Sequence, residues 1–272
     1  MDKDIFSITN KVFVITGGMG QLGQVYMNEI LSRDGKVAIL DIFAYENALV
    51  TELIEKNDEE NFLYINTDIT QKTQIKSAFS KIINQWKKID VLINNAALDS
   101  PPNAPETEVG AFEEYPEVSY DQVMGVNVKG TFLCCQIFGK FMAQKKSGVI
   151  INISSIYGLV SPRQDIYNFR RIDGKTYFKP AAYSISKSSI YNLTRYLATY
   201  WAKDNIRVNT LTLAGIFNEQ PKEFLDAYTK NVPIGRMANP QEAVGPMLFL
   251  ASNASSYMTG SNLVIDGGWI AW

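Results

Sequence analysis

Seven short segments rich in Val, Ile and Leu recur along the chain, separated by longer segments in which apolar residues have helical spacing. A strand that is apolar on both faces must be covered on both faces, and an intervening helix makes a parallel crossover. The pattern therefore predicts an α/β fold with a doubly wound, seven-stranded parallel sheet and helices on both faces. The strands are expected at 11–17, 36–42, 62–68, 90–97, 148–155, 206–213 and 262–268.

No linker rich in Pro, Gly or Ser divides the strands, and no internal repeat is visible. We therefore predict one Rossmann domain over residues 1–272. Two stretches interrupt the alternation: 98–119 is acidic and loop-like, whereas 162–180 is basic and aromatic. Each follows the carboxyl end of a predicted strand, where open α/β sheets bind ligands, so 162–180 is expected to be an insertion on the substrate side.

The composition excludes several functional classes. The chain has a formal net charge of −2, which offers no basic field for nucleic acid or for an anionic membrane. The adjacent Cys134 and Cys135 cannot build a disulfide framework, so a reducing, cytoplasmic location is expected. No apolar run reaches the roughly 20 residues of a membrane span, and the first residues lack a signal-peptide pattern. Histidine is absent, which removes the commonest general base and metal ligand, and we expect no metal site.

A glycine-rich turn, TGGMGQLG at 16–23, directly follows the first predicted strand. Gly18, Gly20 and Gly23 match G-x-G-x-x-G, a turn that lets the backbone approach a pyrophosphate at a helix N-terminus. Asp41 ends the second predicted strand, at about the distance that this motif requires. A carboxylate there accepts hydrogen bonds from a ribose and repels a 2′-phosphate, so the pattern predicts NAD rather than NADP.

Tyr183 and Lys187 lie four residues apart in a segment with helical spacing, and therefore on one face of a helix. An unperturbed tyrosine has a pKa of about 10 and is a poor base near neutral pH. A neighbouring ammonium or a nicotinamide cation would favour the phenolate. Lowering the pKa by about 3 units requires about 4 kcal/mol, so we expect these side chains to be buried near charge.

Taken in order, these motifs resemble those of the short-chain dehydrogenases/reductases over essentially the whole chain. The resemblance implies a catalytic tetrad of Asn127, Ser155, Tyr183 and Lys187. The matching pieces are 16–23, Asp41, NNAA at 94–97, VNVKG at 126–130, ISS at 153–155, YSISK at 183–187, IRVNTL at 206–211 and the closing TGSNLVIDGG.

The resemblance also implies a role for each member of the tetrad. Tyr183 would exchange a proton with the substrate oxygen, and Ser155 would hydrogen-bond that oxygen. Lys187 would bind the nicotinamide ribose and depress the tyrosine pKa, and Asn127 would hold a water in a proton relay. Two alternatives stay open, because Ser154 adjoins Ser155 and because Asn127 could be a structural amide within a helix.

A larger set of residues is implied to contact NAD, and Asn94 and its neighbours would form a wall beside the adenosine ribose. Asp68 could meet the adenine or could cap the next helix. The implied set is Gly17, Gly18, Gly20, Gln21, Leu22, Gly23, Asp41, Asp68, Ile69, Asn95, Ala96, Tyr183, Lys187, Gly215 and Ile216.

The sequence departs from the family pattern at several positions. The single-domain branch usually has T-G-x-x-x-G-x-G, whereas this chain has Gln21 in place of the second glycine and reads T-G-x-x-G-x-x-G, as in the extended branch. NNAA replaces N-N-A-G, and Ala214 stands where the family usually has proline. We expect cofactor binding to persist with altered contacts to the phosphates.

The segment 162–180 makes the interval between Ser155 and Tyr183 about twice the usual family spacing, and it carries five basic residues against two acidic ones. It could be a solvated loop or a subunit contact. We favour a roof over the substrate pocket in which Arg163, Arg170 and Arg171 hold an anionic group, because the insertion leaves and rejoins the chain between two catalytic residues. The acidic stretch 98–119 could face this insertion or be solvated.

The sequence thus predicts an NAD-dependent oxidoreductase that transfers a hydride between nicotinamide and a hydroxyl or ketone carbon of a phosphorylated or nucleotide-linked sugar. The alternatives are an NAD-retaining sugar epimerase or dehydratase, and a non-catalytic dinucleotide-sensing scaffold. The pattern is similar, more loosely, to a bacterial branch associated with surface-polysaccharide and flagellin-glycan synthesis, including legionaminic-type sugars. Family members commonly form homodimers or homotetramers, and the apolar surfaces of 191–203 and 267–272 suit such contacts.

Overall fold

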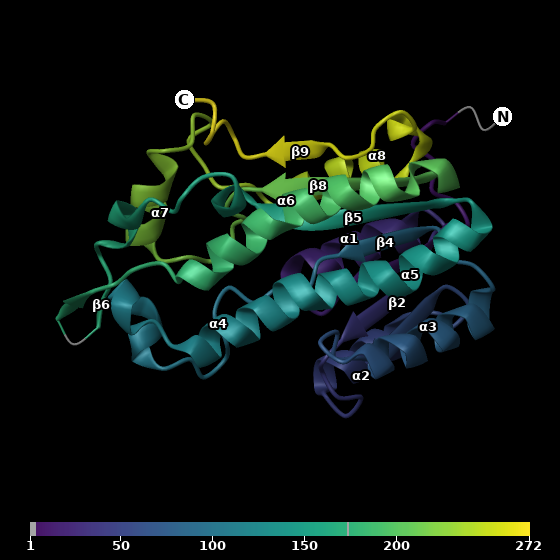
Figure 1. Ribbon diagram of the computed structural model, residues 1–272, viewed down its shortest axis with the longest axis horizontal. Coiled ribbons are helices and arrows are strands. Elements are labelled where there is room, and N and C mark those ends of the chain that lie inside the picture. The colour runs from purple at the N-terminus through teal and green to yellow at the C-terminus, as the bar shows by residue number, and fades with distance from the viewer. Residues whose placement is uncertain (1–3, 173) are drawn as a thin grey trace.

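A computed structural model describes residues 4–172 and 174–272. Within these residues a seven-stranded, wholly parallel sheet runs in the order β3-β2-β1-β4-β5-β8-β9, which confirms the predicted Rossmann architecture (Figure 1). Each of the seven predicted strand segments forms one of these strands. They are β1 (Val12–Thr16), β2 (Lys36–Asp41), β3 (Phe62–Asn66), β4 (Val91–Asn94), β5 (Gly148–Ser155), β8 (Ile206–Leu213) and β9 (Asn262–Ile265).

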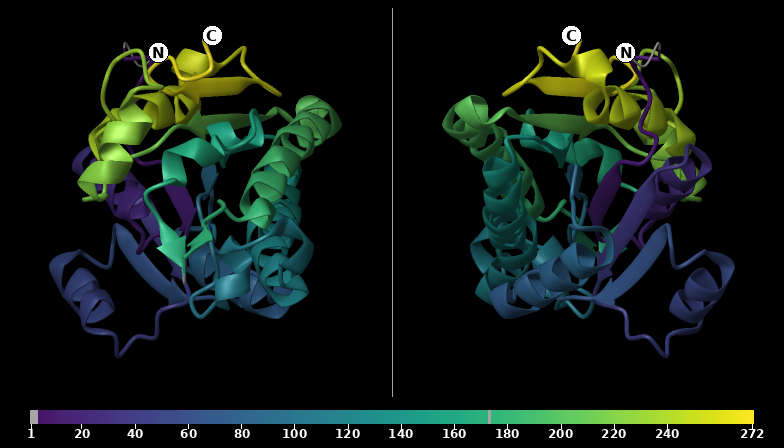
Figure 2. Two further views of the ribbon diagram at one scale, coloured as in Figure 1. Left: turned by 90° about the vertical axis from the view of Figure 1, so that its left-hand side faces the viewer. Right: turned by 90° about the vertical axis from the view of Figure 1, so that its right-hand side faces the viewer.

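Helices cover both faces of the sheet, so that the molecule has three layers (Figure 2). One face packs against α1 (Gln21–Ser32), α2 (Ala48–Lys56) and α8 (Val244–Ala251). The other face packs against α3 (Lys72–Trp86), α5 (Thr131–Lys145) and α6 (Ala181–Trp201).

Alternation along a central strand explains why these strands are apolar throughout. In β1, Phe13 and Ile15 point into the core formed with α1 and α8, whereas Val12 and Val14 point into the core formed with α3, α5 and α6. All five β1 residues are buried. Burying both faces at about 25 cal/mol per Å² of apolar surface makes these strands the chief stabilising element of the fold.

Further elements gather at the carboxyl ends of the strands, on the left of Figure 1. They are α4 (Glu117–Met124), a π-helical turn (Gly125–Gly130) that joins it to α5, and α7 (Lys222–Thr229). A third apolar cluster fills this end of the molecule and includes Tyr157, Tyr167 and Tyr228. No helix in the described part of the chain has both the length and the apolar character needed to cross a membrane.

The stretch 162–180, expected to be an insertion, contains local structure that the sequence does not reveal. A turn of 3₁₀-helix at Gln164–Tyr167 precedes an antiparallel hairpin of β6 (Arg171–Ile172) and β7 (Lys175–Thr176). Just before this stretch, Gly158 packs closely against α6, because a Cβ atom there would lie 2.6 Å from the carbonyl carbon of Lys187. The returning end is held by the hydrogen bond from Phe178 N to Val109 O, 2.8 Å long, which joins it to the acidic segment.

Candidate active site

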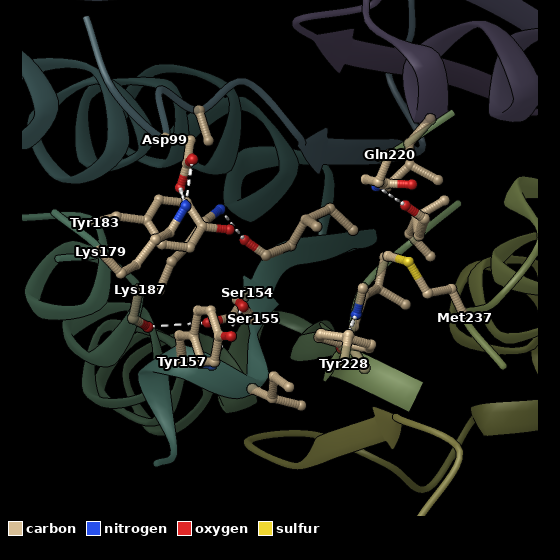
Figure 3. A pocket seen from close by; sticks show the side chains of 18 of the residues that line it. Asp99, Ser154, Ser155, Tyr157, Lys179, Tyr183, Lys187, Gln220, Tyr228 and Met237 are labelled. Carbon is tan, nitrogen blue, oxygen red and sulfur yellow. Dashed lines mark hydrogen bonds and ion pairs between the residues drawn. The ribbon is translucent and has the colours of Figure 1, made fainter. Parts of the chain in front are cut away.

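A cavity of about 390 Å³ opens at the carboxyl edge of the sheet, between β5, α6 and the segment that follows β8 (Figure 3). Ser155, Tyr183 and Lys187 all line it. Ser155 ends β5, and the other two residues lie in the first two turns of α6. The fold therefore brings three members of the predicted tetrad to one cavity.

Tyr183 lies beside Ser155 and Lys187. Ser155 and Tyr183 line the same cavity, and the Ser155 side chain lowers the pKa of the Tyr183 phenol. The Lys187 ammonium lies 5.8 Å from the centre of the tyrosine ring and donates a hydrogen bond to Ile153 O, 3.1 Å away. The spacing of four residues thus places both side chains on one helix face, as predicted.

Burial dominates the protonation of this pair. Burial raises the pKa of Tyr183, the charge of Asp99 raises it further, and the hydrogen bond from Ser155 lowers it. Burial lowers the pKa of Lys187 to about 8, which the charge of Asp99 opposes. The tyrosine pKa is thus raised rather than depressed, because desolvation outweighs the opposing contribution of Ser155.

The neighbouring serines have different partners. Ser154 donates its hydroxyl to Lys187 O, 2.9 Å away, and so joins β5 to α6. Ser155 accepts a hydrogen bond from Tyr157 N, 3.2 Å away, and its side chain lowers the pKa of the Tyr183 phenol. This arrangement favours Ser155 over Ser154 as the group that meets a substrate oxygen.

Asn127 holds the surroundings of the site together. It lies in the π-helical turn and is 2% exposed. Its Oδ1 accepts from Leu98 N at 2.7 Å, and its Nδ2 donates to Leu98 O and to Ser186 Oγ at 2.9 Å each. The side chain therefore has the structural role that the sequence left open, while its part in a proton relay stays a prediction.

The N-terminus of α1 is suited to a pyrophosphate. The helix begins at Gln21, and Gly20 precedes it; no side chain caps this end, and no acidic residue lies in the first turn. The free N–H groups and the partial positive charge of the helix therefore stay available to an anion.

Two glycines of this loop are required by the fold itself. Gly17 has a φ of +64°, and a Cβ atom there would lie 2.7 Å from Ala96 Cα. A Cβ atom at Gly23 would lie 2.5 Å from Gly18 Cα. At Gly20 the nearest neighbour would be Gly17 O at 3.4 Å, so the protein alone does not require this glycine.

Asp41 lies against the glycine loop at the end of β2. Its carboxylate accepts from Met19 N at 2.9 Å and from Ile42 N at 2.8 Å, and the residue is 8% exposed. Burial raises its pKa, and these backbone hydrogen bonds oppose that shift. No basic residue occurs at 42–55, so this part of the chain offers no cation to a 2′-phosphate.

The other residues implied to contact NAD have mixed surroundings. Asn95 N and Ala96 N both donate to Thr16 Oγ1 at 3.1 Å, which fixes the end of β4 to the glycine loop. Asp68 accepts from Thr70 N at 2.8 Å within a turn, whereas the N-cap of α3 is Gln71, so Asp68 does not cap that helix. Ile69 is buried in the core, whereas Leu22, Asn95, Gly215 and Ile216 line the cavity.

Gln21, the departure from the family pattern, bridges two parts of the site. Its Nε2 donates to Phe217 O at 2.8 Å. Phe217 lies in the segment after β8, next to Gly215 and Ile216. The side chain therefore ties the start of α1 to the opposite wall of the cavity.

Sequence reasoning missed two charged residues of the cavity, Asp99 and Lys179. They form an ion pair, and the Lys179 ammonium lies 5.3 Å from the centre of the Tyr183 ring (Figure 3). In the sequence they are single charges within the acidic and the basic segment. The opposite charges of 98–119 and 162–180 left open that the two segments face each other, and the structure shows this contact in the Asp99–Lys179 pair.

The predicted arginines lie apart from these residues. Arg163 pairs with Asp165 at 2.8 Å and donates to Asn231 at 2.7 Å. The Arg170 guanidinium lies 5.2 Å from the centre of the Tyr177 ring. Neither is among the described residues that line the cavity, and the side chain of Arg171 lies outside the described part. Their contact with substrate stays a prediction.

The chain is similar to known proteins along almost its whole length. The family model described as enoyl-(acyl carrier protein) reductase matches residues 22–270. An NAD-dependent glycerol dehydrogenase of Listeria innocua serovar 6a is 34% identical over 98% of this chain and 96% of its own. Post-translational flagellin modification protein A of Campylobacter coli is 29% identical over 96% of this chain and 99% of its own.

A solved structure extends the likeness to three dimensions. A short chain dehydrogenase from Leptospira borgpetersenii serovar Hardjo-bovis, crystallised with bound NAD⁺, superposes with a TM-score of 0.83. It is 34% identical, and the match covers 99% of this chain and 96% of that one. The fold, the cavity and these relatives agree, and the chain belongs to the short-chain dehydrogenase/reductase superfamily of oxidoreductases.

Proposed function

We propose that the protein is an NAD-dependent dehydrogenase that interconverts a hydroxyl and a ketone on a polyol or sugar. The observation that carries the proposal is the meeting of Ser155, Tyr183 and Lys187 in one cavity that also reaches Leu22 of the glycine loop. The likeness to a glycerol dehydrogenase supports the substrate class. Asp41 and the absence of a basic residue at 42–55 support NAD over NADP.

The chemistry follows from the hydroxyl groups that meet at the cavity. When bound, NAD supplies the acceptor or donor of hydride. Tyr183 takes the proton from the substrate hydroxyl during oxidation and returns it during reduction. Ser155 donates a hydrogen bond to the same oxygen, where negative charge develops. Lys187 holds a ribose hydroxyl with its ammonium and adds positive charge near the phenol.

Turnover of a polyol panel with NAD tests the proposal. Steady formation of NADH, followed by its absorbance, is expected with at least one polyol or keto-sugar pair. Tyr183→Phe should lower kcat by about 10²- to 10⁴-fold, because proton transfer is lost. NAD affinity of the variant, measured by calorimetry, should stay near that of the wild type. Near-normal turnover by the variant would contradict the assigned role of Tyr183.

Two other functions predicted from the sequence remain as competitors. An NAD-retaining epimerase or dehydratase would convert a sugar without net formation of NADH. A dinucleotide-sensing scaffold would bind NAD and convert no member of the panel. Net NADH formation therefore separates the proposed dehydrogenase from both.

A narrower version of the proposal has a phosphorylated or nucleotide-linked sugar as substrate, held by arginines of the insertion. The excess of basic residues in 162–180 supports it. Replacing Arg170 and Arg171 by glutamine should then raise KM and leave NAD affinity unchanged. Unchanged substrate kinetics would exclude this version.

We also propose that the protein forms a homodimer or homotetramer and works in the cytoplasm. Exposed aromatic residues on α5 and α6, namely Phe132, Tyr196 and Tyr200, support an interface on this face. Cys134 and Cys135 are both unpaired and buried, which fits a reducing compartment.

A further inference from the structure

The Asp99–Lys179 pair stands at the cavity wall beside Tyr183, and neither the motifs nor the proposed chemistry uses it. We infer that this pair recognises the substrate and selects a neutral polyhydroxy compound over an anionic one. The inference rests on the proposed dehydrogenase function and names the substrate class of that same site.

The pair is held in place from both sides. Lys179 is the last but one residue before α6, and its backbone N donates to Gln164 Oε1 at 2.9 Å. Its side chain is 11% exposed, whereas that of Asp99 is 57% exposed and open to the cavity mouth. Asp99 comes from the segment after β4, close to Leu98, which Asn127 fixes. The two charges therefore occupy a defined position next to the reacting oxygen site.

The chemistry of the pair matches neighbouring hydroxyl groups. An ammonium has three N–H donors, and a carboxylate has about four acceptor positions, so each partner keeps free hydrogen-bonding capacity within the ion pair. A hydroxyl both donates and accepts. Two adjacent hydroxyls of a polyol can therefore bond the ammonium and the carboxylate together.

The same pair opposes an anionic substrate. Asp99 balances the charge of Lys179, so a carboxylate or phosphate gains no net attraction unless it displaces Asp99. An anion that binds beside the intact pair meets the like charge of Asp99, which is a repulsive element of specificity.

The rest of the cavity carries one further charge, on a group that the proposed chemistry assigns to the ribose. Besides this pair, the only acidic or basic side chain among the described lining residues is that of Lys187. Its ammonium donates a hydrogen bond to Ile153 O. The opposite wall bears the uncharged polar groups of Tyr228 and Gln220, whereas Tyr157 lies beside Ser155 (Figure 3).

Substrate preference in charge-neutralised variants tests the inference. Asp99→Asn and Lys179→Met would each be assayed with NAD and two neutral probes, glycerol and xylitol, and with two anionic probes, glycerol 3-phosphate and gluconate. Both variants should lose at least about tenfold in kcat/KM for the neutral probes, mainly through KM, by loss of one or two charge-assisted hydrogen bonds. Asp99→Asn leaves an unpaired ammonium and should raise the anionic-to-neutral ratio by about tenfold, whereas Lys179→Met should lower it.

Controls separate recognition from misfolding. NAD affinity and thermal midpoint should stay near wild-type values, and Asp99→Glu and Lys179→Arg should recover part of the neutral activity. Lys222 and Asp226 form a similar pair on α7, exposed and outside the cavity lining. Lys222→Met and Asp226→Asn should change neither substrate class.

The outcomes distinguish this inference from the proposed function. If the wild type turns over the neutral probes but the Asp99 and Lys179 variants change both substrate classes by the same factor, the inference is overturned and the dehydrogenase function stands. A wild type that prefers the anionic probes also overturns it. A wild type that turns over none of the four probes would count against the proposed polyol function, and the inference would fall with it.

Discussion

Lys187 and Lys179 approach the same phenol from different surroundings. Lys187 is buried in α6 with a backbone carbonyl as its partner, whereas Lys179 is paired with a carboxylate at the cavity mouth. Burial lowers the pKa of Lys187, so the charge of its ammonium responds to pH and to ligands. The charge of Lys179 is balanced by Asp99.

The burial of Lys187 makes stability depend on pH. Its folded pKa of about 8 is below the ordinary value of 10.5, so the unfolded chain binds more protons between these values. The free energy of unfolding should therefore rise with pH in this window, by at most about 3 kcal/mol. Relative to Lys187→Met, the wild type should gain stability between about pH 7 and about pH 10, measured by urea unfolding. A difference that stays constant across this range would contradict the prediction.

Asp41 should determine the choice of dinucleotide. Asp41→Asn keeps an oxygen for Met19 N but removes the negative charge that repels a 2′-phosphate. The ratio of NAD to NADP affinity, measured by calorimetry, should fall at least about tenfold. Asp58→Asn is the matched control, because its carboxylate accepts from Glu60 N within a turn and lies outside the implied NAD contacts, and it should leave the ratio unchanged. Equal ratios in wild type and Asp41→Asn would remove Asp41 as the selector.

The limits of sequence reasoning are visible in single residues. Tyr183 and Lys187 could be paired from the sequence because a spacing of four fixes their relation on a helix. Asp99 and Lys179 are 80 residues apart, and their contact depends on how two irregular segments meet. The raised pKa of Tyr183 also required the structure, because desolvation is set by packing and not by spacing.

At the scale of elements, the long periodic segments were predictable and the short ones were not. Strands buried on both faces, such as β5, leave an unbroken apolar run in the sequence. The hairpin of β6 and β7 has two residues in each strand, too few to produce a period. Its turn at Gly174, with a φ of +76°, is a conformation that any glycine permits and that predicts no particular pairing.

Within the glycine loop, Gly23 is needed for the fold, whereas Gly20 is expected to matter only for NAD binding. Gly23→Ala places a Cβ atom 2.5 Å from backbone and should destabilise the protein, with a lower thermal midpoint. Gly20→Ala meets nothing closer than 3.4 Å and should keep the wild-type midpoint. It should still weaken NAD binding at least about tenfold, if a pyrophosphate lies against the start of α1. Unchanged NAD affinity in Gly20→Ala would place the pyrophosphate elsewhere.

At the scale of the whole molecule, α5 and α6 present an aromatic face that the sheet does not cover. The rings of Tyr196 and Tyr200 stack with centres 6.1 Å apart, and both side chains are more than half exposed. An aromatic surface of this kind favours burial against a second copy of the chain.

Charge on this face should separate the subunits. Tyr196→Glu combined with Tyr200→Glu would place unpaired carboxylates in a desolvated contact, which costs several kcal/mol. Light scattering should show an oligomer for the wild type and a lower mass for the double variant. Tyr257→Glu, at a fully exposed site elsewhere, should keep the wild-type mass. A monomeric wild type would contradict the proposed assembly.

The stretch between Ser155 and Tyr183 is fixed near both of its ends, which bears on how its length and sequence can change in evolution. Because Gly158 abuts α6 and Phe178 is bonded to Val109, the length of chain between these anchors can vary without displacing the serine or the tyrosine. Homologues could therefore change their substrate specificity by exchanging this stretch while they keep the same catalytic residues. A chimera with a foreign stretch would then oxidise a different compound by the same steps.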